Sequence, residues 1–320
     1  MDEPVAVLHS SARRQSGPQR LLRAAGAGRL LKLRLSADMR ADDAFRAILA
    51  DCLTQASAHA GVLRAGRSVE ALHQLRVSLR RLEVVLAAFG RAFGQDWFEE
   101  LRGRVKVISA RLGPARDLDV FLGRVWDKAT AERATDFTPL RRAVEREQDK
   151  AWDQVELCVT SEDFGHLLDD IAALSQSRLP IGGEKSLRQV ARAVLKAASR
   201  RVVKRGRVAR TLEEGDLHRL RIAIKKLRYL GQFLAPLYDS KDVKRTAAAL
   251  KRMQEQLGHL NDMAHARALI ADLMRRESHA AIGYGAGLVA GHYSTGRKRR
   301  AKKALRRYDD FRKLKPFWKT

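Results

Sequence analysis

The chain has 320 residues, 45% of them apolar, which is enough to bury a substantial core in one large domain or two modest ones. Its formal net charge of +26 favours an anionic partner. Two cysteines without a pairing pattern or a Cys/His metal spacing argue against a disulfide framework and a zinc site, and no apolar run reaches the roughly 18 residues that a membrane span needs. We therefore expect a cytoplasmic protein with no cofactor and no membrane partner.

The positive charge lies in the second half of the chain. Residues 36–176 carry a formal charge of −3, whereas residues 177–320 carry +24. Two runs contribute much of it, RRVVKRGRVAR at 200–210 and RKRRAKKALRRYDDFRKLK at 297–315. One such run alone is commonly a solvated helix face, but the two together indicate a polyanion partner.

The composition favours helix, because Ala, Leu, Arg and Lys dominate while aromatic residues make up 6% and proline is scarce. The predicted fold class is all-α. After a basic tail at residues 1–32, which we expect to be flexible, Ser36 and Ser68 are candidate caps for the first two helices. A capping box at Asp96 predicts the third helix, which Pro114 should kink or interrupt.

Two further helices should begin near Pro139 and Ser161, and a linker then divides the chain. The stretch SQSRLPIGGEKS at 175–186 holds one proline and two adjacent glycines, which is typical of a connection between folded units. The predicted boundaries are about 36–176 for the first half, about 177–185 for the linker and about 186–318 for the second half.

The second half repeats the first at a constant offset of 145 residues, without a gap. LGPARDL at 112–118 meets LGHLNDM at 257–263, and His73 meets His218. The period is too long for a solenoid repeat, so we predict two four-helix-bundle-like halves related by a pseudo-two-fold axis, at which symmetric cations meet.

One helix in each half carries a histidine and cations along one side, in LHQLRVSLRRL at 72–82 and LHRLRIAIKKL at 217–227. At about 100° per residue the leucines form an apolar stripe that faces the core, while the histidine and the cations fall in a separate wedge about 60° wide beside it. Such a flank often pairs with carboxylates or meets water. Its recurrence in the slightly acidic first half indicates a shared site instead. The wedge consists of His73, Arg76 and Arg80 in the first copy and of His218, Arg221, Lys225 and Arg228 in the second.

Five stretches, in chain order, resemble the motifs of the conserved histidine α-helical domain, abbreviated CHAD. They are LHQLRVSLRRLEVVLAAF, LGPARDLDVFL, DLHRLRIAIKKLRYLGQFLAPLY, LKRMQEQLGHLNDMAHARAL and FRKLKPFW. The resemblance covers about residues 33–318 and implies a helical fold of two pseudo-symmetric bundles whose basic central surface binds inorganic polyphosphate, often at polyphosphate granules. Many members also carry a triphosphate-tunnel (CYTH) domain, whose E-x-E-x-K signature is absent from this sequence, so the phosphohydrolase activity of that domain is not expected.

The family's histidines match the two wedge histidines, and its basic helix positions match the wedge cations. Polyphosphate presents one charge per phosphate and no base, so recognition must come from closely spaced Arg and Lys donors, with Arg adding bidentate geometry. Lys106 and Lys251 also occupy equivalent positions at the offset of 145, and we include both among the predicted binding residues. The predicted polyphosphate-binding residues are His73, Arg76, Arg80, Lys106, His218, Arg221, Lys225, Arg228 and Lys251.

Two other functions stay open. Sequence-independent binding of nucleic acid fits the basic charge, but the basic stretches have little aromatic interleaving to stack bases, so any contact should be weak. Metal-assisted cleavage of phosphoanhydrides would use Asp117, Asp119 and Asp262 with Mg²⁺. Since Asp119 meets Ala264 in the repeat and no catalytic constellation accompanies it, we expect a binding protein and not an enzyme. Asp117 and Asp262 should instead orient neighbouring basic residues.

Overall fold

The computed structural model describes residues 33–130, 137–178, 186–276, 280–294 and 296–319. The described residues form helices and turns and no strand, which confirms the predicted all-α fold. An isolated antiparallel bridge pairs Arg40 with Ser186. The tail predicted at residues 1–32 and most of the predicted linker lie outside the described residues.

The first half follows the predicted order of helices, with a short π-helical segment, η2, after α5. The bounds are α2 (Ala41–Arg64), α3 (Val69–Phe93), α4 (Trp97–Arg111), α5 (Gly113–Val120), η2 (Phe121–Trp126), α6 (Asp127–Thr130), α7 (Thr138–Thr160) and α8 (Glu162–Gln176).

Several predicted boundaries are confirmed. Ser68 caps α3, since its hydroxyl accepts a hydrogen bond from the Ala71 backbone N–H at 3.2 Å. Helix α4 gives way to α5 beside Pro114, as expected for a residue that cannot continue a helix from its interior. Helices α7 and α8 begin beside Pro139 and Ser161.

Two predicted caps are wrong. Helix α2 begins at Ala41 and not at Ser36, because the Leu187 backbone N–H donates to the Met39 carbonyl at 2.8 Å and holds the preceding backbone outside the helix. Asp96 precedes α4 but makes no side-chain cap bond. Its φ of −77° and ψ of −27° are already helical, whereas a capping residue has an extended backbone.

The second half has longer helices than the first. The offset of 145 residues carries α2 onto the helix called α9, α3 onto α10, and both α4 and α5 onto the single helix α11. His259 stands where the first half has Pro114, so α11 continues through this position. The bounds are α9 (Leu187–Val208), α10 (Glu214–Leu234), α11 (Ser240–Arg276), α12 (Ala280–Ser294) and α13 (Arg297–Arg312).

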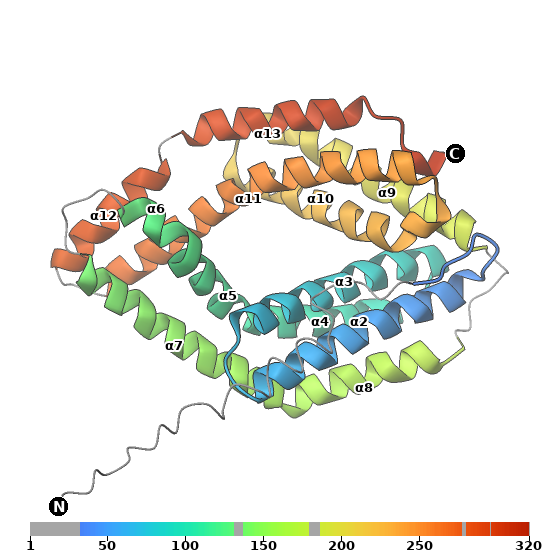
Figure 1. Ribbon diagram of the computed structural model, residues 1–320, viewed down its shortest axis with the longest axis horizontal. Coiled ribbons are helices and arrows are strands. Elements are labelled where there is room, and N and C mark those ends of the chain that lie inside the picture. The colour runs from blue at the N-terminus through green and yellow to red at the C-terminus, as the bar shows by residue number, and fades with distance from the viewer. Residues whose placement is uncertain (1–32, 131–136, 179–185, 277–279, 295, 320) are drawn as a thin grey trace, which may run out of the picture.

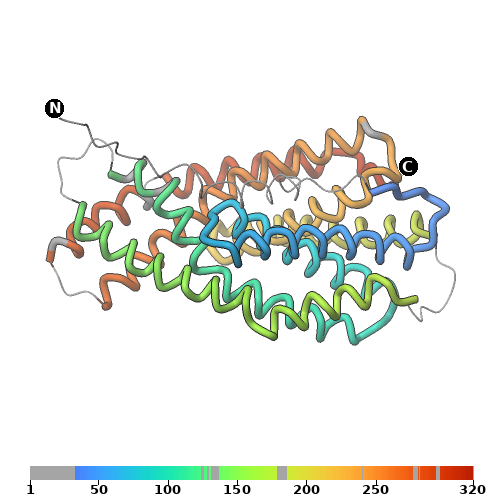
Figure 2. The backbone as a smooth tube through the Cα atoms, turned by 60° about the horizontal axis from the view of Figure 1, so that its bottom comes forward, coloured from blue at the N-terminus to red at the C-terminus, as the bar shows by residue number. Residues whose placement is uncertain are grey.

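The helices form two bundles that meet along α3 and α10 (Figure 1). Helices α2, α3, α4 and α8 pack together in one bundle, and α9, α10, α11 and α13 pack together in the other. Figure 2 shows the same arrangement after a rotation. At one end of the molecule α7 of the first half packs against α12 of the second, so the two halves are interleaved and not simply placed side by side.

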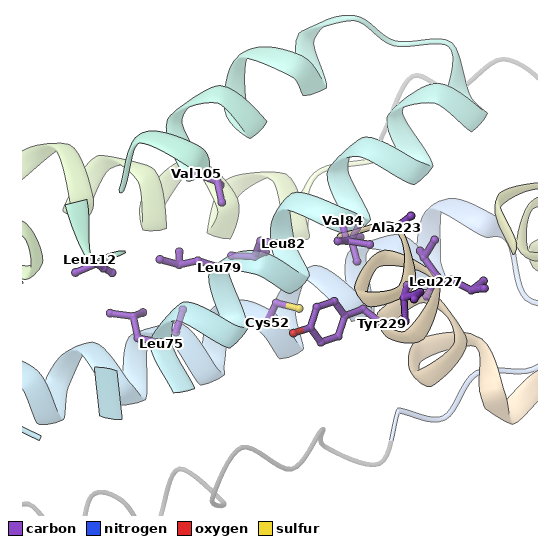
Figure 3. Close-up of a cluster of buried hydrophobic side chains, with 14 of the residues drawn as sticks. Cys52, Leu75, Leu79, Leu82, Val84, Val105, Leu112, Ala223, Leu227 and Tyr229 are labelled. Atoms are coloured by element: carbon purple, nitrogen blue, oxygen red, sulfur yellow. The ribbon is translucent and has the colours of Figure 1, made fainter. Parts of the chain in front are cut away.

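The hydrophobic core is continuous across the two halves. Figure 3 shows Leu79 and Leu82 of α3 in one cluster with Val105 of α4 and with Ala223 and Tyr229 of α10. All five side chains are buried. Full burial of a large apolar side chain contributes about 1.5–3 kcal/mol, so this contact fixes α3 firmly against α10. It thereby sets where the polar flanks of both helices lie.

Candidate functional site

A cleft of about 720 Å³ lies between α3, α5, α10 and α11. Six arginine or lysine side chains, three carboxylates and four histidines line it. Seven of the nine predicted binding residues are among them, so the structure brings the wedges of both halves to one place. These seven are His73, Arg76 and Arg80 of α3 and His218, Arg221, Lys225 and Arg228 of α10.

The two remaining predicted residues do not line the cleft. Lys106 of α4 and Lys251 of α11 are both exposed. The Lys251 side chain is 71% exposed, and its amine lies 3.9 Å from a Glu255 carboxylate oxygen. Lys106 and Lys251 occupy equivalent positions in the repeat, but equivalent positions do not have to face the other half of the molecule.

The apolar stripe explains why the wedge is half-buried. Leu72, Leu75 and Leu79 are inaccessible to solvent, so α3 is oriented by its leucines. The flank beside them is turned toward α5, α10 and α11 and away from bulk water. His73, Arg76 and Arg80 are accordingly of intermediate exposure.

A hydrogen bond to the end of α4 holds Arg76 in place. Its guanidinium Nη1 donates to the Ser109 carbonyl oxygen at 2.8 Å, in the last turn of α4, where helix carbonyls lack intrahelical partners. Burial lowers the pKa of Arg76, the nearby Asp117 carboxylate opposes that effect, and Arg80 and Arg116 add to it. The side chain is therefore anchored at one end of the cleft with like charges beside it.

Cations from both halves crowd around Lys225. Burial lowers the pKa of Lys225 to about 6, the like charges of Arg80, Arg221 and Arg228 add to this effect, and Asp262 opposes it. Arg80 belongs to α3 and the other two arginines to α10, so the wedges meet at this point. Grouping like charges away from water destabilises the protein unless an anion joins them.

Two buried arginine donors in the cleft have no partner. The Nε atoms of Arg221 and Arg228 are buried, and within the described residues neither makes a hydrogen bond. An unsatisfied buried polar group costs about 1–3 kcal/mol. Strongly perturbed and under-satisfied groups that converge in a cleft are typical of a functional site.

Two of the three carboxylates of the cleft interact electrostatically with its arginines, and their role in orienting these side chains stays a prediction. Asp117 of α5 and Asp262 of α11 match at the offset of 145, and they raise the pKa of Arg76 and of Arg221, respectively. Asp119 does not line the cleft. It is buried, and one of its oxygens accepts hydrogen bonds from Gln148 at 2.8 Å and Trp152 at 3.1 Å, which ties α5 to α7. The described part of the chain holds no group of three or more His, Cys, Asp or Glu side chains arranged for a metal ion.

Histidines of both halves also face the cleft. His218 Nδ1 lies 2.8 Å from the Asn261 side-chain oxygen, and His265 Nδ1 lies 3.5 Å from an Asp117 oxygen, across the two halves. Burial lowers the pKa of His73, and the cations Arg116, Arg76 and Lys225 lower it further, against the effect of Glu70. His73 is therefore mostly neutral at neutral pH when the cleft is empty.

Sequence reasoning missed three basic side chains of the cleft. Arg116 lies in LGPARDL, at the position that matches Asn261 of LGHLNDM, so the repeated motif contained a signal for it. His259 and His265 match Pro114 and Val120, which are not basic, so the repeat offered no signal for either histidine.

Fold and site together define an all-α protein with a cationic cleft between two helical halves. A family model described as the CHAD domain matches residues 47–271, and the chain therefore belongs to the CHAD domain family. The resemblance seen in the five motifs is confirmed.

Two solved structures share the fold. The CHAD domain from the plant Ricinus communis is 26% identical, with a TM-score of 0.77, and the match covers 90% of this chain and 96% of that one. PptA from Streptomyces chartreusis is 18% identical, with a TM-score of 0.66, and the match covers 85% of this chain and 99% of that one. The second likeness supports the fold alone. A comparison with curated proteins gives no match. In the described ranges no helix is both long and apolar enough to cross a membrane.

Proposed function

We propose that this protein binds inorganic polyphosphate in the cleft between its two halves. The observation that carries the proposal is that Arg80, Arg221 and Arg228 line one cleft with the half-buried Lys225 and lower the pKa of its amine, after burial itself. A linear polyanion stabilises all four groups in their charged form at once, and its oxygens accept hydrogen bonds from their guanidinium and ammonium groups. Membership of the CHAD family, whose motifs led to the same expectation, supports this proposal.

The lining of the cleft suits a chain of phosphates better than a nucleic-acid strand. Single-stranded nucleic acid is held largely by stacking of its bases on aromatic side chains. Phe121 and Tyr229 line the cleft, but both are buried, so neither offers a ring face for stacking. Polyphosphate has no bases, so its binding does not depend on an exposed aromatic ring.

Binding without cleavage is part of the proposal. Asp117 and Asp262 raise the pKa of Arg76 and of Arg221, respectively, and Asp119 accepts hydrogen bonds from Gln148 and Trp152. The proposal includes no cofactor, and the family resemblance supports action in the cytoplasm at polyphosphate granules. Release of phosphate from polyphosphate and Mg²⁺ by the purified protein, lost in Asp117→Asn, would contradict this part and favour a metal-assisted phosphohydrolase.

Two charge-matched variants test the binding site. The cleft variant replaces Arg76, Arg80, Arg221 and Lys225 with Gln, which changes helix propensity little. The control variant removes four exposed cations that line neither this cleft nor the groove beside α13. The control substitutions are Arg142→Gln, Lys150→Gln, Lys241→Gln and Lys244→Gln.

The cleft variant should lose more than about 100-fold in affinity for long-chain polyphosphate, since each charge-assisted hydrogen bond contributes about 1.5–3 kcal/mol. Its plot of log affinity against log salt should also become shallower, because fewer counterions are released. The control variant should bind within a few-fold of wild type. Equal losses in the two variants would show that net charge alone attracts polyphosphate and would sink the cleft assignment. If circular dichroism shows the cleft variant unfolded, the pair Arg80→Gln and Lys225→Gln repeats the test with two charges.

A further inference from the structure

The two basic runs of the second half come together outside the cleft. Tyr308 of α13 donates a hydrogen bond to the Val203 carbonyl of α9 at 2.9 Å. A Cβ at Gly206 would lie 2.1 Å from the Tyr308 ring, so glycine is needed for the helices to pack this closely. Arg210, just beyond α9, pairs with Asp309 of α13 at 2.5 Å. Helix α13 and the C-terminal end of α9 therefore form one surface.

The solvent side of this surface is cationic. Helix α13 lies along one edge of the molecule (Figure 1). Ala301 and Leu305 of this helix are buried against the protein, so its charged flank faces solvent. Arg207 and Arg210 lie near Tyr308, since they oppose the rise in its pKa that burial causes. We call this surface the outer basic face. It comprises Arg207 and Arg210 together with the exposed α13 residues Lys298, Arg299, Lys302, Lys303, Arg306 and Arg307.

Few carboxylates neutralise the outer basic face. Arg210 pairs with Asp309, and Arg307 lies 3.6 Å from Asp310. Among the described residues no carboxylate comes within ion-pair distance of the neighbouring cations of α13. These unpaired cations are Lys302, Lys303 and Arg306.

A groove of about 900 Å³ lies beside α13 and is separate from the cleft. Gln256 of α11 lines this groove, whereas Gln254 and Gly258 of the same helix line the cleft. Helix α11 therefore stands between the two sites, and one ligand segment does not fill both.

We propose that the outer basic face binds the sugar-phosphate backbone of double-stranded nucleic acid without reading its sequence. The exposed cations of α13 follow the helix, and Arg207 near the end of α9 and Arg210 just beyond it add two cations beside them. A duplex presents two rows of phosphates, with one charge per about 1.7 Å of its axis. Helix α13 has 16 residues. Its length of about 24 Å spans roughly seven base pairs.

The chemistry of this face favours a duplex over other anionic partners. Tyr308 is buried, so it offers no ring on which a single strand can stack its bases. The apolar residues of α13 point inward, which leaves nothing to insert into a bilayer. Polyphosphate carries a single row of charges, and the proposed function assigns it to the cleft.

Fluorescence anisotropy with a labelled duplex of about 25 base pairs and random sequence tests the proposal. The face variant carries Arg299→Gln, Lys302→Gln, Lys303→Gln and Arg306→Gln, and it is compared with wild type, the cleft variant and the control variant. The face variant should lose at least tenfold in duplex affinity. Removing four phosphate contacts should also reduce the salt slope by up to about 3.6, at roughly 0.9 per phosphate. The cleft and control variants should bind the duplex like wild type.

Failure of this proposal and failure of polyphosphate binding are distinguishable, because each depends on a different variant. Wild type that does not bind the duplex at low salt, or equal loss in all three variants, would overturn the assignment of the outer basic face. So would a face variant that loses polyphosphate but keeps the duplex, which would make the face a second polyphosphate site. Binding of vesicles that contain anionic lipid, without binding of the duplex, would identify a membrane surface as the partner instead. Simultaneous binding of the duplex and a short polyphosphate would support two independent sites.

Discussion

The affinity for polyphosphate should fall as the pH rises above about 6, because binding restores a proton to Lys225. In the free protein, burial and then Arg80, Arg221 and Arg228 hold the pKa of this amine at about 6. At pH 8 only about 1% of it is charged. Bound phosphates favour the ammonium form and raise the pKa back toward its usual value of about 10.4.

The magnitude follows from proton linkage. A group whose pKa is higher in the complex than in the free protein takes up a proton on binding at every pH between the two values, so its contribution is complete below the lower pKa and decreases above it. One proton per complex corresponds to a tenfold loss of affinity per pH unit. Between pH 6 and pH 8 the loss should be about 50-fold if the pKa in the complex is about 9 or higher. His73, whose pKa burial and cations also lower, should add to the dependence at lower pH.

Isothermal titration calorimetry with a long polyphosphate measures this effect, because a long chain has few titrating end groups. Repeating the titration in buffers of different ionisation enthalpy counts the protons taken up. If the pKa in the complex is about 9, Lys225→Gln should bind about tenfold more weakly than wild type at pH 8, lose far more at pH 5.5 and show a flatter profile. His73→Gln should keep the slope above pH 6.5. The reasoning would be refuted by a flat wild-type profile between pH 6 and 8, or by a Lys225→Gln profile as steep as that of wild type.

Three further changes test other parts of the structure. Lys225→Met should raise the free energy of unfolding at pH 7, measured with urea, by about 1–3 kcal/mol, because it removes a buried amine among like charges. A decrease would contradict the crowding around this residue. Lys106→Gln with Lys251→Gln should bind polyphosphate within about twofold of wild type, as expected for exposed charges, and a tenfold loss would place the ligand path outside the cleft. Asp119→Ala should lower the free energy of unfolding by about 1–3 kcal/mol, since Trp152 loses its acceptor. Unchanged thermal unfolding of that variant would show that the contact does not stabilise α5.

The wedge could be predicted from the sequence because one physical constraint determines its position. Leu72, Leu75 and Leu79 must be buried, and helix geometry then fixes the direction of every other side chain on α3. The same argument applies to α10. The prediction that the two wedges meet required one more assumption, namely that the halves pack against each other through equivalent helices. Residues of α3 and α10 share one hydrophobic cluster, so this assumption is correct.

Other parts of the site and fold lacked such a constraint. Lys106 lies on an exposed face of α4. Its match with Lys251 in the repeat therefore did not indicate whether either side chain points toward the cleft. His265 and its match in the repeat, Val120, both line the cleft, but valine at position 120 gave no indication that the second copy carries a basic side chain there. The packing of α7 on α12 depends on contacts between distant segments, which periodicity within one helix does not encode.

One position of the repeat differs in charge between the two copies, with glutamate on α3 and arginine on α10. The offset of 145 residues pairs Glu83 of α3 with Arg228 of α10. The Glu83 carboxylate lies 3.3 Å from the Lys226 amine and so joins the two halves. Arg228 instead lines the cleft, with its guanidinium 5.5 Å from the centre of the Tyr229 ring. Strict symmetry with arginine at both positions would remove the ion pair and place a like charge beside Lys226. Strict symmetry with glutamate at both would remove a cation from the cleft. At this position the repeated helix therefore contributes a cation to the cleft on one copy and an ion pair between the halves on the other.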